Sequence, residues 1–148
     1  MATPERNMWT RVIDGLYTTI GPKHLRLQRI ENGTANGIPD VMFSAKWRRK
    51  KRGGWIELKR VREYPKRSNT PIRIDHFTKE QKLFMRLHGR ITGSVYLLLL
   101  IESDWYIFDH VHIDKIGETA TRFDLMAMSV HWWPEKCDWR ELFEVLVR

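Results

Sequence analysis

The chain has 148 residues, of which 42% are hydrophobic and 30% are charged, which excludes a disordered or membrane-embedded protein and indicates one ordinary folded domain. Its net charge of +8 favours a polyanionic partner such as nucleic acid. A single cysteine excludes an intramolecular disulfide and a Cys-rich zinc site, so we expect a reducing, intracellular environment. The longest apolar run, residues 95–101, is too short to span a bilayer and the N-terminus lacks a secretory signal, so no membrane association is expected.

In chain order, the sequence predicts a helix, three strands, a second helix, two strands and a helical tail. Helical spacing of apolar residues begins at Pro4, behind the candidate N-cap Thr3, and strand-like alternation follows further along. Segment 119–130 is ambiguous between helix and loop. The predicted helices cover residues 4–20, 78–88 and 139–146, and the predicted strands cover residues 24–31, 41–47, 55–61, 95–101 and 105–108.

Capping residues set the boundaries of the later helices. Thr78 with Gln81 three residues on has the pattern of a capping box, which begins the second helix. Gly89 is expected to end that helix, and Asp138 is expected to cap the last one.

A dense basic segment lies between the second and third predicted strands. Six of the seven residues 46–52 are positively charged and Gly53-Gly54 follows, which predicts a hairpin with a solvated basic turn. Trp47 and Trp55 flank the segment, and aromatic side chains beside arginines suit contacts with bases. The alternative is a charge run that is merely solvated. The residues expected to contact DNA are Arg48, Arg49, Lys50, Lys51, Arg52 and, near the N-terminus, Arg6.

Two acids and a lysine are predicted to meet on the second and third strands. Side chains two apart on a strand share a face, so Glu57 and Lys59 point the same way while the residues between them point into the core. An antiparallel hairpin with its turn at the basic segment places Asp40 opposite residues 59–61. Two carboxylates and a backbone carbonyl, that of Leu58, suit Mg²⁺, and a nearby lysine can orient water or neutralise phosphate. The competing interpretations are a turn aspartate and an exposed cross-strand ion pair.

These residues resemble a known family. The motif Pro-Asp at 39–40, followed after the hairpin by Glu-Leu-Lys at 57–59, resembles the signature of the PD-(D/E)xK nuclease superfamily. With Gly-Ile-Pro-Asp-Val at 37–41, Trp-Ile-Glu-Leu-Lys at 55–59 and Thr-x-x-Gln at 78–81, the chain is similar to the virus-type replication-repair nuclease branch. That branch lies close to the archaeal-type Holliday junction resolvases.

The resemblance covers about residues 4–101, and the tail from Trp105 onward matches nothing in the family. It implies an α/β fold with a restriction-endonuclease-like core, in which helices flank a mixed central β-sheet. We expect a single nuclease domain over residues 1–148, with a core of about 4–110 and a C-terminal extension of about 111–148.

Carried onto these positions, the resemblance implies a metal site and a catalytic lysine. Asp40 and Glu57 would be metal ligands together with the Leu58 carbonyl, Lys59 would be the catalytic lysine, and Gln81 would be an accessory glutamine over the site. Members of this family often take a further acidic ligand from the first helix. The candidates for that ligand, in order of preference, are Glu5, Glu31 and Asp14.

The expected function is that of a Mg²⁺-dependent, structure-selective endodeoxyribonuclease, with Mn²⁺ as a substitute. We expect a homodimeric Holliday junction resolvase that acts on branched or double-stranded DNA in recombination and repair. The resemblance also suggests a bacteriophage protein that works in the cytoplasm of its bacterial host. Three alternatives stay open: a nuclease for flaps, single strands or ends; a nucleic-acid-binding module with an inactive site; and a small interaction protein whose charge is incidental.

Overall fold

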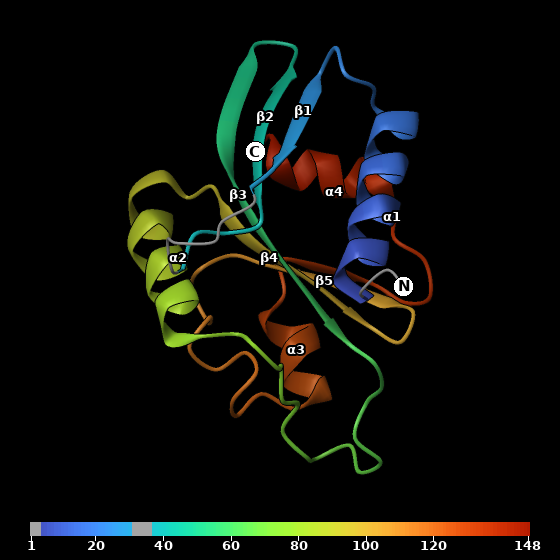
Figure 1. Cartoon of the computed structure of the whole chain (residues 1–148), viewed down its shortest axis with the longest axis vertical. Helices are drawn as coiled ribbons and strands as arrows, with labels where there is room; N and C mark the ends of the chain where they lie inside the picture. The colour runs from blue at the N-terminus through green and yellow to red at the C-terminus, as the bar shows by residue number, and fades with distance from the viewer. Residues whose placement is uncertain (1–3, 31–36) are drawn as a thin grey trace.

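A six-stranded mixed β-sheet forms the middle layer of the protein, with helices on both faces (Figure 1). The computed structural model describes residues 4–30 and 37–148, with side chains described from Asn7 onward. The strands are β1 (Leu25–Arg29), β2 (Val41–Trp47), β3 (Lys50–Val61), β4 (Val95–Ile101), β5 (Asp104–Phe108) and β6 (His131–Trp133). The helices are α1 (Pro4–Thr19), α2 (Lys79–Thr92), α3 (Arg122–Met128) and α4 (Trp139–Leu146).

The strands lie side by side in chain order, and β3 and β4 form the parallel pair while the other neighbours are antiparallel. A parallel pair needs a long crossover connection, which here contains α2. This confirms the predicted single α/β domain, its mixed sheet, and the order of elements as far as β5.

Each face of the sheet is covered by its own helices. On one face α1 and α4 pack together, and Leu16 and Leu142 share a core with Leu58 of β3. On the other face α2 and α3 bury Met85 and Leu125 against the opposite side of β4 and β5. Every residue of β4 is buried, as expected for a central strand covered on both sides.

Helix α2 begins where the sequence predicts and ends later. Thr78 is its N-cap and forms a capping box with Gln81, whereas the C-cap is Gly93, in the left-handed region at φ 66°. The prediction that Gly89 ends the helix is therefore wrong. Gly89 is a packing residue, because a Cβ there would lie 2.5 Å from the side chain of His110.

The β2–β3 hairpin turns earlier than predicted. The turn residues are Arg48 and Arg49, with Trp47 paired to Lys50, so the rest of the basic segment and both following glycines lie within β3. Arg48 adopts a positive φ of 58°, which is uncommon for a residue other than glycine, so the composition of this turn does not reveal it. Gly54 is required inside the strand instead, because a Cβ there would collide with the Ser94 carbonyl.

The segment after β5 joins the same layers. β6, which was not predicted, pairs with β5, and the ambiguous segment forms α3 behind the N-cap Thr121. The last predicted helix is confirmed as α4, whose N-cap Asp138 accepts hydrogen bonds from the amides of Arg140 and Glu141. None of the described helices combines the length and apolarity needed to cross a membrane.

Candidate active site

Glu57 and Lys59 lie on the face of β3 that α2 covers. The alternation of the strand places both side chains there and sends Ile56 and Leu58 into the core under α1 and α4, as predicted. Glu57 is 1% exposed and Lys59 is 8% exposed. The competing interpretation of an exposed cross-strand ion pair is therefore wrong, since both charged groups lie inside the protein.

Asp40 lies beside Glu57, at the start of β2. Val41 pairs with Ile56, so the preceding residue stands level with Glu57 and not with residues 59–61 as predicted. The earlier turn causes this correction, because it shifts the register of the hairpin. The Oδ2 atom of Asp40 accepts a hydrogen bond of 2.9 Å from the backbone amide of Leu58, which fixes the carboxylate against β3.

The loop before Asp40 is held close to the start of α2. Gly37 has a φ of 90°, and a Cβ there would lie 2.7 Å from the backbone carbonyl oxygen of Glu80. Pro39 is buried between this contact and β2. The glycine and proline of the predicted motif therefore act by bringing Asp40 and α2 to the same place.

Lys59 is held in position by the loop between β3 and α2. Its Nζ donates a 2.7 Å hydrogen bond to the backbone carbonyl of His76 and lies 3.6 Å from Glu57 Oε1. The ammonium also lies 5.6 Å from the centre of the Phe77 ring. His76 adopts a positive φ of 62°, an uncommon backbone conformation that aims its carbonyl at the lysine.

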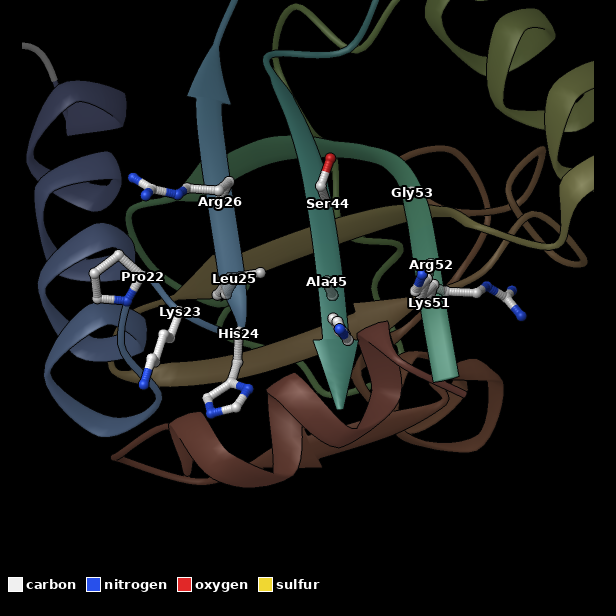
Figure 2. A pocket seen from close by; sticks show the side chains of 11 residues that line it. Pro22, Lys23, His24, Leu25, Arg26, Ser44, Ala45, Lys51, Arg52 and Gly53 are labelled. Carbon is white, nitrogen blue, oxygen red and sulfur yellow. The ribbon is translucent and has the colours of Figure 1, made fainter. Parts of the chain in front are cut away.

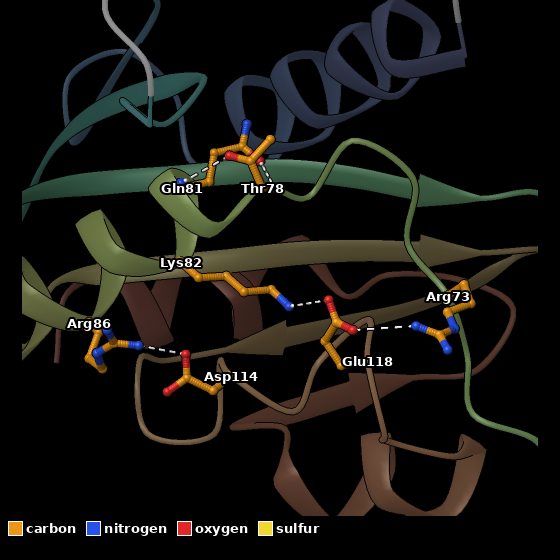
Figure 3. Close-up of polar contacts among 7 residues, drawn as sticks. All are labelled: Arg73, Thr78, Gln81, Lys82, Arg86, Asp114 and Glu118. Carbon is orange, nitrogen blue, oxygen red and sulfur yellow. Dashed lines mark hydrogen bonds and ion pairs between the residues drawn. The ribbon is translucent and has the colours of Figure 1, made fainter.

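Gln81 reaches the site from the first turn of α2, as the resemblance implies. Its Nε2 donates to Glu57 Oε1 at 3.4 Å, while its Oε1 accepts from the backbone amide of Thr78 at 2.9 Å. The side chain thus completes the capping box with Thr78 (Figure 3) and contacts Glu57 at the same time.

The two acids oppose each other electrostatically. The pKa of Glu57 is raised to about 9, mainly because burial disfavours its charged form and further because Asp40 lies beside it, whereas Lys59 opposes the shift. A hydrogen bond between the two carboxyls requires a proton on one of them. With both ionised, Glu57 Oε2 has no hydrogen-bond partner among the described atoms. The pair therefore needs a proton or a cation.

The oxygen atoms present suit a hard divalent cation. The carboxylates of Asp40 and Glu57 and the carbonyl of Leu58 are the kinds of ligand that Mg²⁺ prefers. Within residues 7–30 and 37–148, no group of three His, Cys, Asp or Glu side chains could hold a metal ion. A cation would thus take two carboxylates from this part of the chain, with water or a further acid in its remaining positions.

The structure bears on only one of the three candidates for a further carboxylate ligand. The side chain of Glu5 and all of Glu31 lie outside the described residues. Asp14 lies on α1 in a hollow with Trp105 and Trp139, and Trp105 belongs to the core on the face opposite Glu57. Asp14 is therefore excluded as a ligand of this site.

A set of ion pairs that sequence reasoning missed lies next to the site (Figure 3). Lys82, 6% exposed, has its Nζ 3.5 Å from Glu118 Oε1 and 5.0 Å from the Phe77 ring centre. Glu118 also pairs with Arg73 of the preceding loop, at 3.3 Å. The sequence around Lys82 gives no sign that this lysine is buried, because its ion-pair partner, Glu118, is 36 residues away in the chain. These contacts fix the loop that carries His76 and Phe77.

The residues predicted to contact DNA do not form one cluster, because three of them lie on β3, where successive side chains point to opposite faces. Arg48 and Arg49 are exposed at the turn, and Lys50 and Lys51 point to opposite faces of β3. The side chain of Arg6 lies outside the described residues. Arg52 differs from the others, because its guanidinium is engaged by backbone and side-chain acceptors within the protein. These acceptors are Ser94 Oγ, Gly93 O, Thr92 O and Arg148 O.

The tryptophans that flank the basic segment are also occupied. Trp47 packs edge-on against Phe143 of α4, and Trp55 packs edge-on against Phe84 of α2. Both are half-buried in these contacts, so the predicted contact with bases would use the part of each ring that stays exposed.

No protein-family model matches the sequence, and no curated protein matches it significantly. Function is therefore inferred from the residues and their geometry. That geometry brings together Asp40, Glu57, Lys59 and Gln81 from separate segments of the chain, a set able to bind a cation and a phosphate oxygen.

Proposed function

We propose that the protein is a metal-dependent, structure-selective endodeoxyribonuclease. The observation that carries this proposal is the buried Glu57 carboxyl, which lies beside Asp40 and whose Oε2 has no partner among the described atoms. Burying the Glu57 carboxyl next to a second, half-buried carboxyl destabilises a fold, so this pair, together with an oriented lysine, supports a catalytic role.

Asp40 and Glu57, with the Leu58 carbonyl, would hold Mg²⁺ or Mn²⁺. A bound cation of this kind activates water and offsets negative charge on a phosphodiester under attack. Lys59, kept in place by the His76 carbonyl, has remaining donor capacity for a non-bridging phosphate oxygen or the attacking water. Gln81 orients Glu57 through its 3.4 Å contact and closes the side of the site next to α2.

Four-way DNA junctions are the proposed substrate, cut by a homodimer with a restriction-endonuclease-like core. Support comes from the motif resemblance, the mixed sheet with its helix crossover between β3 and β4, and the net positive charge. The proposed location is the cytoplasm of a phage-infected bacterium, where such an enzyme would meet branched DNA. A nuclease for flaps, single strands or ends would use the same catalytic residues.

Labelled four-way, flapped and linear DNAs, incubated with Mg²⁺ or Mn²⁺, test the proposal. We expect paired nicks across the junction with the wild-type protein and none with Glu57→Gln or Lys59→Ala. Glu144→Gln removes an exposed carboxylate of α4, on the other face of the sheet, and is the matched control, which should keep full activity. Cleavage confined to flaps or ends would show that the protein is a flap or end nuclease and not a junction resolvase. DNA binding without any cleavage by the wild-type protein would favour an inactive binding module.

A further inference from the structure

The face of the sheet that carries Glu57 is open at the hairpin end. Strands β1, β2 and β3 project beyond α2 (Figure 1), and their residues alternate there between buried and exposed. Phe43 and Ala45 are buried under the helices of one face, whereas Ser44 and Lys46 are exposed on the other. The uncovered face is continuous with the strand positions that form the proposed active site.

Basic side chains on this face lie next to one another on neighbouring strands, with no acidic side chain between them. Lys46 stands directly opposite Lys51 in the β2–β3 ladder, and Arg26 lies on the neighbouring strand. Among the described residues, none of these three forms an ion pair. Like charges directly opposite each other destabilise a sheet, and a bound polyanion would offset that repulsion.

Small residues lie between the cations and leave a hollow of about 680 Å³ (Figure 2). The row across the three strands runs from Arg26 through Ser44 to Gly53. Gly53 has no positive φ, and a Cβ there would meet its nearest neighbour, the Phe43 carbonyl oxygen, at an ordinary 3.7 Å. Internal packing therefore does not require glycine at this position, but its missing side chain keeps the floor of the hollow low.

We propose that this open face, which we call the basic floor (Arg26, Ser44, Lys46, Lys51 and Gly53), binds the phosphate backbone of one duplex arm of the DNA substrate. The inference rests on the proposed nuclease function and names the surface that holds its substrate. Lys51 and Glu57 lie six residues apart on one face of β3, which corresponds to about 20 Å at roughly 3.3 Å per residue. At about 3.4 Å per nucleotide step along a strand, the phosphate at Lys51 lies about six base pairs from the bond that is cut.

A duplex fits this surface better than a single strand. Proteins that hold unpaired nucleic acid present aromatic rings on which bases stack. Trp55, the aromatic residue on this side of β3, is half-buried and packs edge-on against Phe84. Cations flanking small side chains provide phosphate contacts instead, which fix position without reading base sequence.

Binding to a four-way junction with long arms, measured in Ca²⁺ over a range of salt concentrations, tests the basic floor. We expect Lys46→Gln and Lys51→Gln each to reduce the slope of log affinity against log salt by about 0.9, and the double variant by about twice that amount. Lys50→Gln is the matched control, because it removes the same charge one residue away on the opposite face. It should leave the slope unchanged.

Arm length gives a second readout. On junctions whose arms are cut to about four base pairs, the double variant should bind as the wild type does, since the contact at about six base pairs is lost to both. An unchanged slope in the double variant, an equal loss in Lys50→Gln, or an equal loss on single-stranded DNA would each overturn the inference. If the wild type cleaves DNA but the double variant has the same salt slope as the wild type, the basic floor alone is rejected. If the variants show the expected slopes but the wild type does not cleave, the nuclease function alone is rejected.

Discussion

The carboxylate of Asp40 accepts a hydrogen bond of 2.9 Å from the backbone amide of Leu58. This bond joins Asp40, which directly precedes β2, to β3, and it places the Asp40 carboxylate next to Glu57. One oxygen of Asp40 is thus used for structure, and in the proposed metal site the other would bind the cation.

Substitutions of Asp40 should separate these two roles. Asp40→Asn keeps an acceptor for the Leu58 amide, so we expect nearly wild-type stability with loss of metal-dependent cleavage. Asp40→Ala leaves that amide unpaired, and we expect it to lower the free energy of unfolding by about 1–3 kcal/mol. Urea denaturation in EDTA measures the difference, and equal stability of the two variants would show that the bond does not support the fold.

Glu57→Gln should stabilise the metal-free protein, and more so at higher pH. In the unfolded chain Glu57 loses its proton near the ordinary glutamate pKa of 4.5, whereas in the folded protein it keeps the proton up to a pKa of about 9. Between these values the unfolded state binds fewer protons, so wild-type stability falls as pH rises. Glutamine does not titrate, so the variant should melt at a higher temperature than the wild type, and this difference should grow from about pH 5 to about pH 8.

The same pair of proteins reports on the cation. If Asp40 and Glu57 hold the metal as proposed, added Mn²⁺ should raise the melting temperature of the wild type by binding the folded state, and should leave that of Glu57→Gln unchanged. A difference in melting temperature between the two proteins that is constant over pH would contradict the raised pKa of the buried Glu57. Glu144→Gln, which removes an exposed carboxylate of α4, is measured alongside and controls for a general effect of removing a negative charge.

Gln81 and Thr78 should share an effect on stability but not on catalysis. Both side chains form the capping box of α2, so either change to alanine should cost about 1 kcal/mol of stability. Only Gln81 contacts Glu57, so only Gln81→Ala should lower the rate of cleavage at saturating DNA. Thermal melts and single-turnover cleavage measure the two effects, and an equal rate loss in Thr78→Ala would assign the whole effect to the helix end.

Arg52 should matter for stability, unlike its neighbour in the basic segment. Its guanidinium bonds to Ser94, Gly93 and Arg148, which joins β3 to the start of β4 and to the segment after α4. We expect Arg52→Ala to lower the free energy of unfolding by about 1–2 kcal/mol, since several charge-assisted bonds in a half-buried setting are lost. Lys51→Ala should change it little, because that side chain is exposed. Equal effects of the two changes in urea denaturation would be inconsistent with a structural role for the arginine.

Sequence patterns predicted the candidate site better than the details of the hairpin that builds it. Period-two alternation correctly paired Glu57 with Lys59, and the capping pattern correctly placed Gln81 at the start of α2. The register of Asp40 was missed because Gly53-Gly54 has the composition of a turn, while the actual turn uses Arg48 with a positive φ. What requires glycine at position 54 is Ser94, a neighbour beside another strand that local sequence does not reveal.

Contacts between distant segments account for the other misses. Gly89 looks like a helix end, yet its missing side chain makes room for His110. Arg52 looks like part of a DNA-binding run, yet its acceptors lie about forty or more positions away. β6 has three residues, too few for a periodic pattern to emerge.

The parallel pairing of β3 with β4 has a consequence for the order of events during folding. The β1–β2–β3 meander can form from contacts that are local along the chain, whereas β4 must wait until the crossover has closed. The His76 carbonyl and Gln81 both belong to that crossover. Nascent chains should therefore carry a solvated Glu57, with its ordinary pKa of 4.5, until α2 docks. The proposed active site would then be completed in a late kinetic step, after most of the secondary structure has formed.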